Sequence, residues 1–339
     1  MKNLIAIVVT LFAVNNAFAG DGTTVGGFAD AQLHIDNPSE GFSVHDGAVY
    51  LNHQMGNTSG TVDIPFSAGA QAAAGLVLGG LKGQAFVSHK YDNGVRWKLG
   101  MWDTPFVKEP NDTVNVMFTR RGLAAGTSPF THQGLTLGWA NDMVGFDAVI
   151  ANPDDATVVF DRNTPDFGAV LTVKQDMMHG KVAFLANSNK TTGTSESGHV
   201  LDLAAGVNVD KLTWDVEFLM RKNAITGASA FPTLGTSVSY AMNEWTFGAR
   251  FEYAMKSWEA FALANPAAPT AVPAVAATTF RNYAGTTDDK GWQLTVGPQC
   301  QMTKNLKVRL DFTAKSLTPM GAAAATNTSM TVLSAVYSM

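Results

Sequence analysis

The sequence predicts an all-β fold, a transmembrane antiparallel up-and-down β-barrel of about sixteen strands. Three observations support this fold class. Apolar residues recur at every second position over stretches of about ten residues, which is the side-chain period of a β-strand. Short polar turns alternate with longer connections along the chain, as they do in outer-membrane barrels. An N-terminal export signal precedes the first strand.

Residues 1–19 have the features of a cleavable secretory signal. A basic start is followed by an apolar run at residues 4–14, and Ala17 and Ala19 are the small residues that a signal peptidase reads. The apolar run is too short to cross a bilayer as a stable helix. We therefore expect residues 20–339 to form the mature barrel, in the outer membrane of a Gram-negative bacterium.

The alternation is complete in the most regular segments. Within residues 244–256, Trp245 and Phe247 fall on one face, whereas Arg250 and Glu252 fall on the other. A soluble β-sandwich also alternates, but long segments with aromatic apolar faces favour a membrane barrel. One face of each strand is therefore expected to meet lipid, and the other to meet a water-filled lumen.

Sixteen segments carry this pattern. An even number places both chain ends on the periplasmic side, and a barrel of this size is too wide for its own side chains to fill. It is therefore expected to enclose an aqueous channel. The expected strands are residues 24–36, 46–54, 61–67, 81–91, 94–102, 131–140, 143–151, 166–175, 180–189, 199–208, 211–222, 233–242, 244–257, 291–301, 305–316 and 329–339.

The last segment ends the chain within a strand. Its alternate positions from Thr331 onward include Leu333, Ala335 and Tyr337, and it finishes at Met339. This pattern is similar to the C-terminal signal that the barrel assembly machinery recognises, although that signal usually ends in phenylalanine. The assembly machinery and outer-membrane lipid are therefore expected partners.

Short motifs in the first half of the chain point to one family. A strand ending in Gly100 and Trp102 runs into Thr104-Pro105-Phe106, and the Pro-containing stretch at residues 128–130 precedes Gly134 at the start of a later strand. This order of motifs resembles that of bacterial outer-membrane porins of the β-barrel porin type. The resemblance implies passive diffusion of ions and small hydrophilic solutes, and assembly as a homotrimer.

The connection at residues 103–130 is the candidate constriction of this channel. Loops of such length are uncommon unless they are functional, and the resemblance implies that this one folds into the barrel. We expect Glu109 and Asp112 to face basic wall residues, with Arg96 and Lys98 nearest; an external loop with solvated charges is the alternative. The candidate pore-lining and constriction residues are Lys82, Arg96, Lys98, Asp103, Lys108, Glu109, Asp112, Arg120, Arg121, Arg250, Lys307 and Arg309.

Composition and motifs favour a channel over an enzyme. A single cysteine excludes a disulfide scaffold and a Cys-ligated metal site, and 23 basic against 28 acidic residues argue against nucleic-acid binding. The seven histidines show no metal-ligand spacing, and the chain contains no Gly-x-Ser-x-Gly motif. We therefore expect no catalytic residue, cofactor or metal.

Two other functions stay open at this stage. The Ala- and Pro-rich connection at residues 258–290, together with residues 68–80 and 319–325, predicts a set of apolar external loops. These loops suit a structural or adhesive barrel that uses them for surface contact. A hydrolase with His34 and Asp36 in the lumen is the third possibility.

Overall fold

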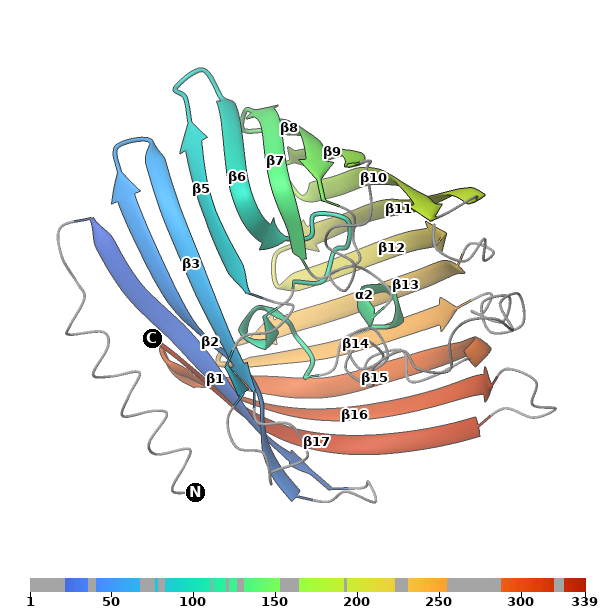
Figure 1. Ribbon diagram of the computed structural model, residues 1–339. Helices are drawn as coiled ribbons and strands as arrows, with labels where there is room; N and C mark the ends of the chain where they lie inside the picture. Colours follow the sequence, from blue (N-terminus) through green and yellow to red (C-terminus); the bar gives the residue numbers. More distant parts are fainter. Residues whose placement is uncertain are drawn as a thin grey trace.

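The computed structural model describes residues 22–35, 41–67, 77–78, 83–110, 112–119, 122–126, 131–152, 165–191, 194–222, 231–254, 288–319 and 326–339. Within these residues, one continuous antiparallel sheet closes on itself as a barrel (Figure 1). Sixteen of its strands form the wall, which confirms the predicted fold class and strand number. A further two-residue strand, β4 (Val77–Leu78), pairs with the end of β3 and was not expected.

Each wall strand falls on one of the sixteen predicted segments. The largest differences are at the ends, where several strands extend beyond the predicted bounds. The wall strands are β1 (Thr23–His34), β2 (Gly41–Met55), β3 (Thr58–Ser67), β5 (Gln84–Lys90), β6 (Val95–Asp103), β7 (Thr131–Ala140), β8 (Val144–Ala151), β9 (Asp166–Gln175), β10 (Met178–Thr191), β11 (Thr194–Val209), β12 (Leu212–Lys222), β13 (Phe231–Met242), β14 (Trp245–Ala254), β15 (Asp288–Thr303), β16 (Leu306–Pro319) and β17 (Thr326–Ser338).

The first and last strands close the barrel. β1 pairs with β2 on one side and with β17 on the other, in a register that joins Phe28 to Ser338 and His34 to Val332. Lipid offers no hydrogen-bonding partner to an unpaired backbone N–H or C=O, so an open sheet edge cannot lie within the bilayer. The β1–β17 pairing is therefore what allows the other strands to span the membrane.

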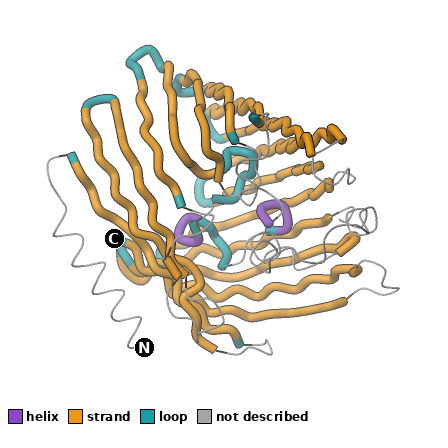
Figure 2. The backbone as a smooth tube through the Cα atoms, in the orientation of Figure 1, coloured by secondary structure: helices purple, strands orange, loops and turns teal. Residues whose placement is uncertain are grey.

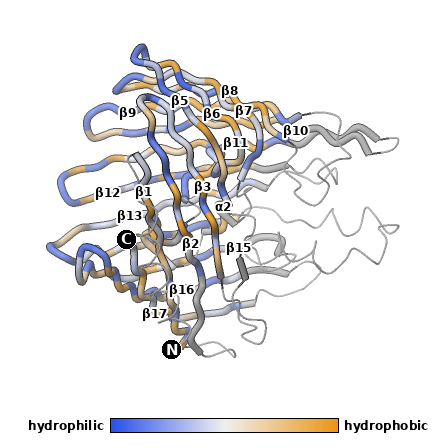
Figure 3. The backbone as a smooth tube through the Cα atoms, turned by 60° about the vertical axis from the view of Figure 1, so that its left-hand side comes forward, coloured by the Kyte–Doolittle hydropathy of each residue, from blue (hydrophilic) through white to orange (hydrophobic). Residues whose placement is uncertain are grey.

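The short turns gather at one end of the barrel, where β1 begins and β17 finishes. In Figure 3 several of these turns are coloured as hydrophilic. Asp176, Asp210 and Asn243 take φ angles of 47°, 51° and 54° in three of them, a left-handed backbone that Asp and Asn tolerate better than most residues. Short turns lie on the periplasmic side of outer-membrane barrels, so this end is the periplasmic one.

The outward faces of the strands are apolar. Leu137 and Leu171 are among many large hydrophobic side chains that remain exposed on the isolated barrel. Trp139, Trp214 and Trp245 are also exposed, and each lies close to a periplasmic turn. Aromatic side chains prefer the boundary between lipid and water, so these residues fit an interfacial girdle.

Two short helices are present among the described residues, and neither is long and apolar enough to cross a membrane. They are η1 (Thr113–Asn115) and α2 (Leu123–Gly126), and both belong to the connection between β6 and β7. The predicted signal at residues 1–19 and almost all of residues 258–290 lie outside the described part of the chain. Their assignments stay predictions.

The assignment of the apolar strand faces to lipid can be tested by placing one charged side chain on such a face. Leu171 lies at the middle of β9 and faces outward, so Leu171→Arg is expected to lower the free energy of unfolding by about 2–4 kcal/mol. Met177→Arg, in the turn that follows β9, serves as the control and should cost about 0–1 kcal/mol. Urea unfolding of the barrel in lipid vesicles measures both, and equal losses would contradict the assignment.

Candidate functional site

The connection between β6 and β7 folds into the barrel. Figure 2 shows its loop and helical segments inside the ring of strands. Within it, η1 packs against β1 and α2 packs against β13 and β14, which lie on distant parts of the wall. We call the described residues of this connection, 104–110, 112–119 and 122–126, the inner loop.

An apolar pocket of the wall holds the start of the inner loop. Phe106 is fully buried, and its ring lies edge-on to His132 with centroids 5.1 Å apart. A side chain at Gly168 would not fit, because a Cβ there would lie 2.6 Å from the Phe106 ring. The pocket and the residues that fill it are Trp102, Phe106, Ala124, Val149, Ala151, Val170, Ala183, Leu185, Val200 and Leu219.

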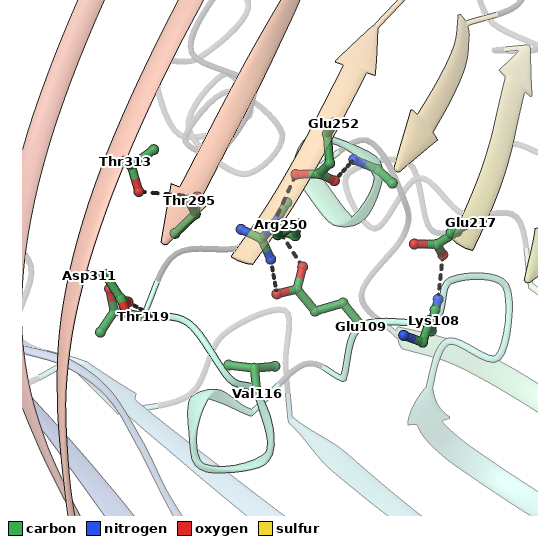
Figure 4. Close-up of polar contacts among 12 residues, drawn as sticks. Lys108, Glu109, Val116, Thr119, Glu217, Arg250, Glu252, Thr295, Asp311 and Thr313 are labelled. Atoms are coloured by element: carbon green, nitrogen blue, oxygen red, sulfur yellow. Dashed lines mark hydrogen bonds and ion pairs between the residues drawn. The ribbon is translucent and has the colours of Figure 1, made fainter. Parts of the chain in front are cut away.

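Polar contacts with β10 and β12 hold the next residues. The Lys108 backbone N–H donates to Glu217 Oε1 at 2.7 Å, and Lys108 Nζ lies 2.5 Å from Asp215 Oδ2 (Figure 4 labels Lys108 and Glu217). Lys181 Nζ donates to the Pro105 carbonyl at 3.3 Å. The wall therefore binds both the backbone and the charged side chain of the loop.

A buried ionic group joins the inner loop to β14. Arg250 Nη1 lies 2.9 Å from Glu109 Oε1, and Arg250 Nε lies 3.3 Å from Glu252 Oε2 (Figure 4). The Gly122 N–H donates to the other Glu109 oxygen at 2.7 Å, and the Ala124 N–H donates to Glu252 at 3.2 Å. A Cβ at Gly122 would lie 2.2 Å from Glu252 Oε1, so a larger residue there would displace the Glu252 carboxylate.

The fully buried Arg309 joins the loop to the closing strands. Arg309 Nη2 lies 3.0 Å from Asp30 Oδ2 on β1, while Nη1 donates to the Val116 carbonyl at 3.2 Å. Two residues further along β16, Asp311 accepts a hydrogen bond from the Thr119 N–H (Figure 4). A buried charge is tolerated only when it is paired and hydrogen-bonded, and these contacts meet that condition for Arg309.

The segment around η1 is held by β16, β2 and β1. Lys307 Nζ donates to the Val114 carbonyl at 3.1 Å, and the Val114 side chain packs against the cluster that contains Phe28. Tyr50 donates its hydroxyl proton to Asp112 Oδ2 at 2.7 Å. The contact of Asp112 with β2 is therefore made by a tyrosine, and the basic neighbour expected for Asp112 stays a prediction.

The expected neighbours of Glu109 were wrong. Arg250 pairs with Glu109, whereas Arg96 forms a two-point contact with Asp147 at 2.9 and 2.6 Å, and Lys98 lies over the Phe86 ring. The expectation relied on closeness along the chain, because β6 directly precedes the loop. The inner loop crosses the lumen, so its charges meet the opposite wall instead.

Some residues fall outside this comparison, and others were missed. Lys82, Arg120 and Arg121 lie outside the described residues, so their roles stay predictions. Tyr50 and Phe106 were not candidates for the site. Tyr50 shares the inward face of β2 with Asp46 and Ala48, but an inward aromatic residue in a strand gives no sign of what it contacts.

Open space remains in the lumen on the side of β3 and β5 to β8. A cavity of about 410 Å³ lies against the inner faces of β3 and β5 to β8, below the start of the inner loop. Polar and charged side chains line most of it. They include Ser88, Lys90, Arg96, Lys98, Asp103 and Asp147.

These features define the class of protein. A closed barrel with an apolar outer face, a charged interior and one loop folded inside is the architecture of an outer-membrane porin. The chain belongs to the family described as "Putative beta-barrel porin-2, OmpL-like", whose model matches residues 6–338. Family and fold together confirm the prediction of a porin channel in the outer membrane of a Gram-negative bacterium.

Solved structures share the fold over nearly the whole chain. The outer-membrane channel DcaP of Acinetobacter baumannii has 12% identity and a TM-score of 0.65, covering 95% of this chain and 99% of its own. Salmonella typhi OmpF, solved with daunomycin, has 12% identity, a TM-score of 0.64 and the same coverages. An anion-selective porin from Comamonas acidovorans has 10% identity and a TM-score of 0.62, covering 94% and 99%. No curated protein matches the sequence.

The apolar anchor of the inner loop can be tested by shortening one side chain. Phe106→Ala removes the ring from its pocket at a cost of roughly 3–5 kcal/mol. We expect the loop to leave its docked position more often, so single-channel recordings should show frequent transitions to a higher conductance.

Phe66→Ala is the matched control for this experiment. Phe66 is also buried, but it packs in a separate cluster with Ala29 that contains no residue of the inner loop. It should lower stability without changing conductance. Indistinguishable recordings from both variants would contradict the anchoring role of Phe106.

Proposed function

We propose that ions and small hydrophilic solutes cross this porin passively, through the part of the lumen that the inner loop leaves open. The observation that carries the proposal is the one-sided docking of the loop. From Pro105 onward its polar contacts reach β10, β12, β14, β16 and β2, whereas the cavity of about 410 Å³ lies against β3 and β5 to β8. A solute would therefore pass beside the loop and not through it.

In this proposal the candidate residues divide into two groups with different tasks. Lys108, Glu109 and Asp112 hold the inner loop against the wall, together with Arg250, Lys307 and Arg309. Arg96, Lys98 and Asp103 line the cavity beside it and would contact the solute. The first group sets the width of the passage, and the second group sets the electrostatic field within it. Width and electrostatic field are the two properties that decide which solutes a channel admits.

We also propose assembly by the barrel assembly machinery and association as a homotrimer, without enzymatic activity. The alternating apolar positions of β17, which include Leu333 and Tyr337, support recognition by the machinery. Membership in a porin family supports a channel in place of an enzyme. The homotrimer is what the resemblance of the chain to porins implies.

Recording from refolded protein in planar bilayers tests the channel and the constriction together. The intact protein should give stable conductance. Deletion of residues 108–121 removes the contacts with Glu217, Arg250 and Arg309, and it should raise the conductance because the loop no longer narrows the lumen.

The deletion variant must be shown to retain its β-barrel, by circular dichroism and by resistance to protease in vesicles. No conductance from well-folded intact protein would contradict the channel. An unchanged conductance after the deletion would contradict only the constricting role of the loop.

A further inference from the structure

We propose that Lys90, Arg96 and Lys98 form a binding subsite for small oxyanions in the periplasmic half of the lumen, and that this subsite makes the channel prefer anions. The inference rests on the proposed channel function and names the class of solute. Three observations support it: a cavity, a set of basic side chains that line this cavity, and the deeper burial of acidic than of basic side chains in the lumen.

The strand register brings the three basic residues together. Lys90 of β5 is paired directly with Arg96 of β6, and Ser88 is paired with Lys98. Residues two apart on a strand share a face, so all four side chains belong to the same inner surface. All four line the cavity of about 410 Å³.

Lys98 keeps hydrogen-bonding capacity for a ligand. Its ammonium lies 4.6 Å from the centre of the Phe86 ring, and no carboxylate of the described residues lies within ion-pair distance of it. An ammonium group has three donors, and an aromatic face attracts the cation without using any of them in a conventional hydrogen bond. An oxyanion beside Lys98 would therefore supply acceptors that the wall does not.

The acidic residues at the cavity cancel only part of this charge. Asp147 forms an ion pair with Arg96 through two contacts of 2.9 and 2.6 Å. Asp103 lies at the edge of the cavity where the inner loop begins. In the turn below, Asp92 accepts a hydrogen bond from the side chain of Asn57. Three basic groups thus face two carboxylates within the cavity lining, with Lys90 exposed to water.

Elsewhere in the described lumen, most carboxylates are buried, and Glu109 and Glu217 are partly exposed. A permeating ion can replace its lost hydration only with groups that it can touch, and the accessible charges are mainly basic. Lys98 and Lys307 are partly exposed and Lys90 is exposed. The buried acidic residues are Asp30, Asp46, Asp63, Asp112, Asp166, Asp202, Asp215, Glu252 and Asp311, compared with Arg250 and Arg309 among the basic ones.

Hydroxyl groups complete the subsite for an oxyanion. Ser59 and Ser88 lie 2.8 Å apart through their Oγ atoms, and Thr136 is the strand partner of Lys98 on β7. All three line the same cavity. Hydroxyl donors suit the several acceptor oxygens of phosphate or a carboxylate, and they add little to the binding of an alkali cation.

The experiment uses the refolded mature protein in planar bilayers. It measures the preference of the channel for anions or cations, and the block of its current by phosphate. In asymmetric KCl, the reversal potential of the intact protein should indicate anion preference. Inorganic phosphate added from the periplasmic side should reduce the chloride current. Lys98→Gln should shift the reversal potential toward cations and raise the phosphate concentration for half-block roughly tenfold, as the loss of one charge-assisted hydrogen bond predicts.

Two further variants separate the subsite from a general charge effect. Lys98→Arg keeps the charge and should retain the block. Lys304→Gln removes the same charge from the periplasmic turn between β15 and β16, outside the cavity lining, and should behave as the intact protein.

Each outcome has a distinct meaning. Absence of conductance from folded protein would overturn the proposed channel function itself. Cation preference in the intact protein, or a Lys98→Gln variant that is blocked as before, would overturn the subsite and leave the channel standing. Equal shifts for Lys98→Gln and Lys304→Gln would also overturn it, because the effect would then arise from surface charge alone.

Discussion

Every other feature of this molecule depends on the hydrogen-bonded closure of β1 against β17. Within lipid, each backbone N–H or C=O group without a hydrogen-bonding partner costs several kcal/mol. A sheet provides partners for all of these groups only when it has no edge. Closure also defines an inside and an outside. Leu171 can then face lipid while Lys181, one strand away, faces the interior. The lumen and the inner loop exist only because this ring is complete.

Closure alone would leave a wide tube, and the inner loop narrows it. Two kinds of interaction hold the loop in place: the Phe106 ring fills an apolar pocket, and Glu109 and Lys108 pair with charged wall residues. These interactions depend on each other. The apolar pocket keeps water away from the neighbouring ion pairs. Electrostatic attraction between these charges is stronger there than it would be in water. The same docking leaves the β5 and β6 side of the lumen accessible, with its basic residues.

The strand pattern was predictable because each strand separates two different solvents. β7 and β9 lie at the predicted residues 131–140 and 166–175, since polar turns mark both of their periplasmic ends. In one region the inner face is itself apolar. Leu185 and Leu219 face the interior, but they cover Phe106 and not water, so the rule that lumenal positions are polar does not hold there.

The sequence by itself determined the topology: the number of strands, their two faces and the end that carries the short turns. A residue facing lipid must be apolar whatever it touches, so this information is local and repeats every two residues. Only the tertiary structure decided which charges meet. Glu109 pairs with Arg250, which lies 141 positions away, because the path of the loop across the lumen brings them together. No periodicity encodes that path, since it results from many contacts between the loop and distant parts of the wall.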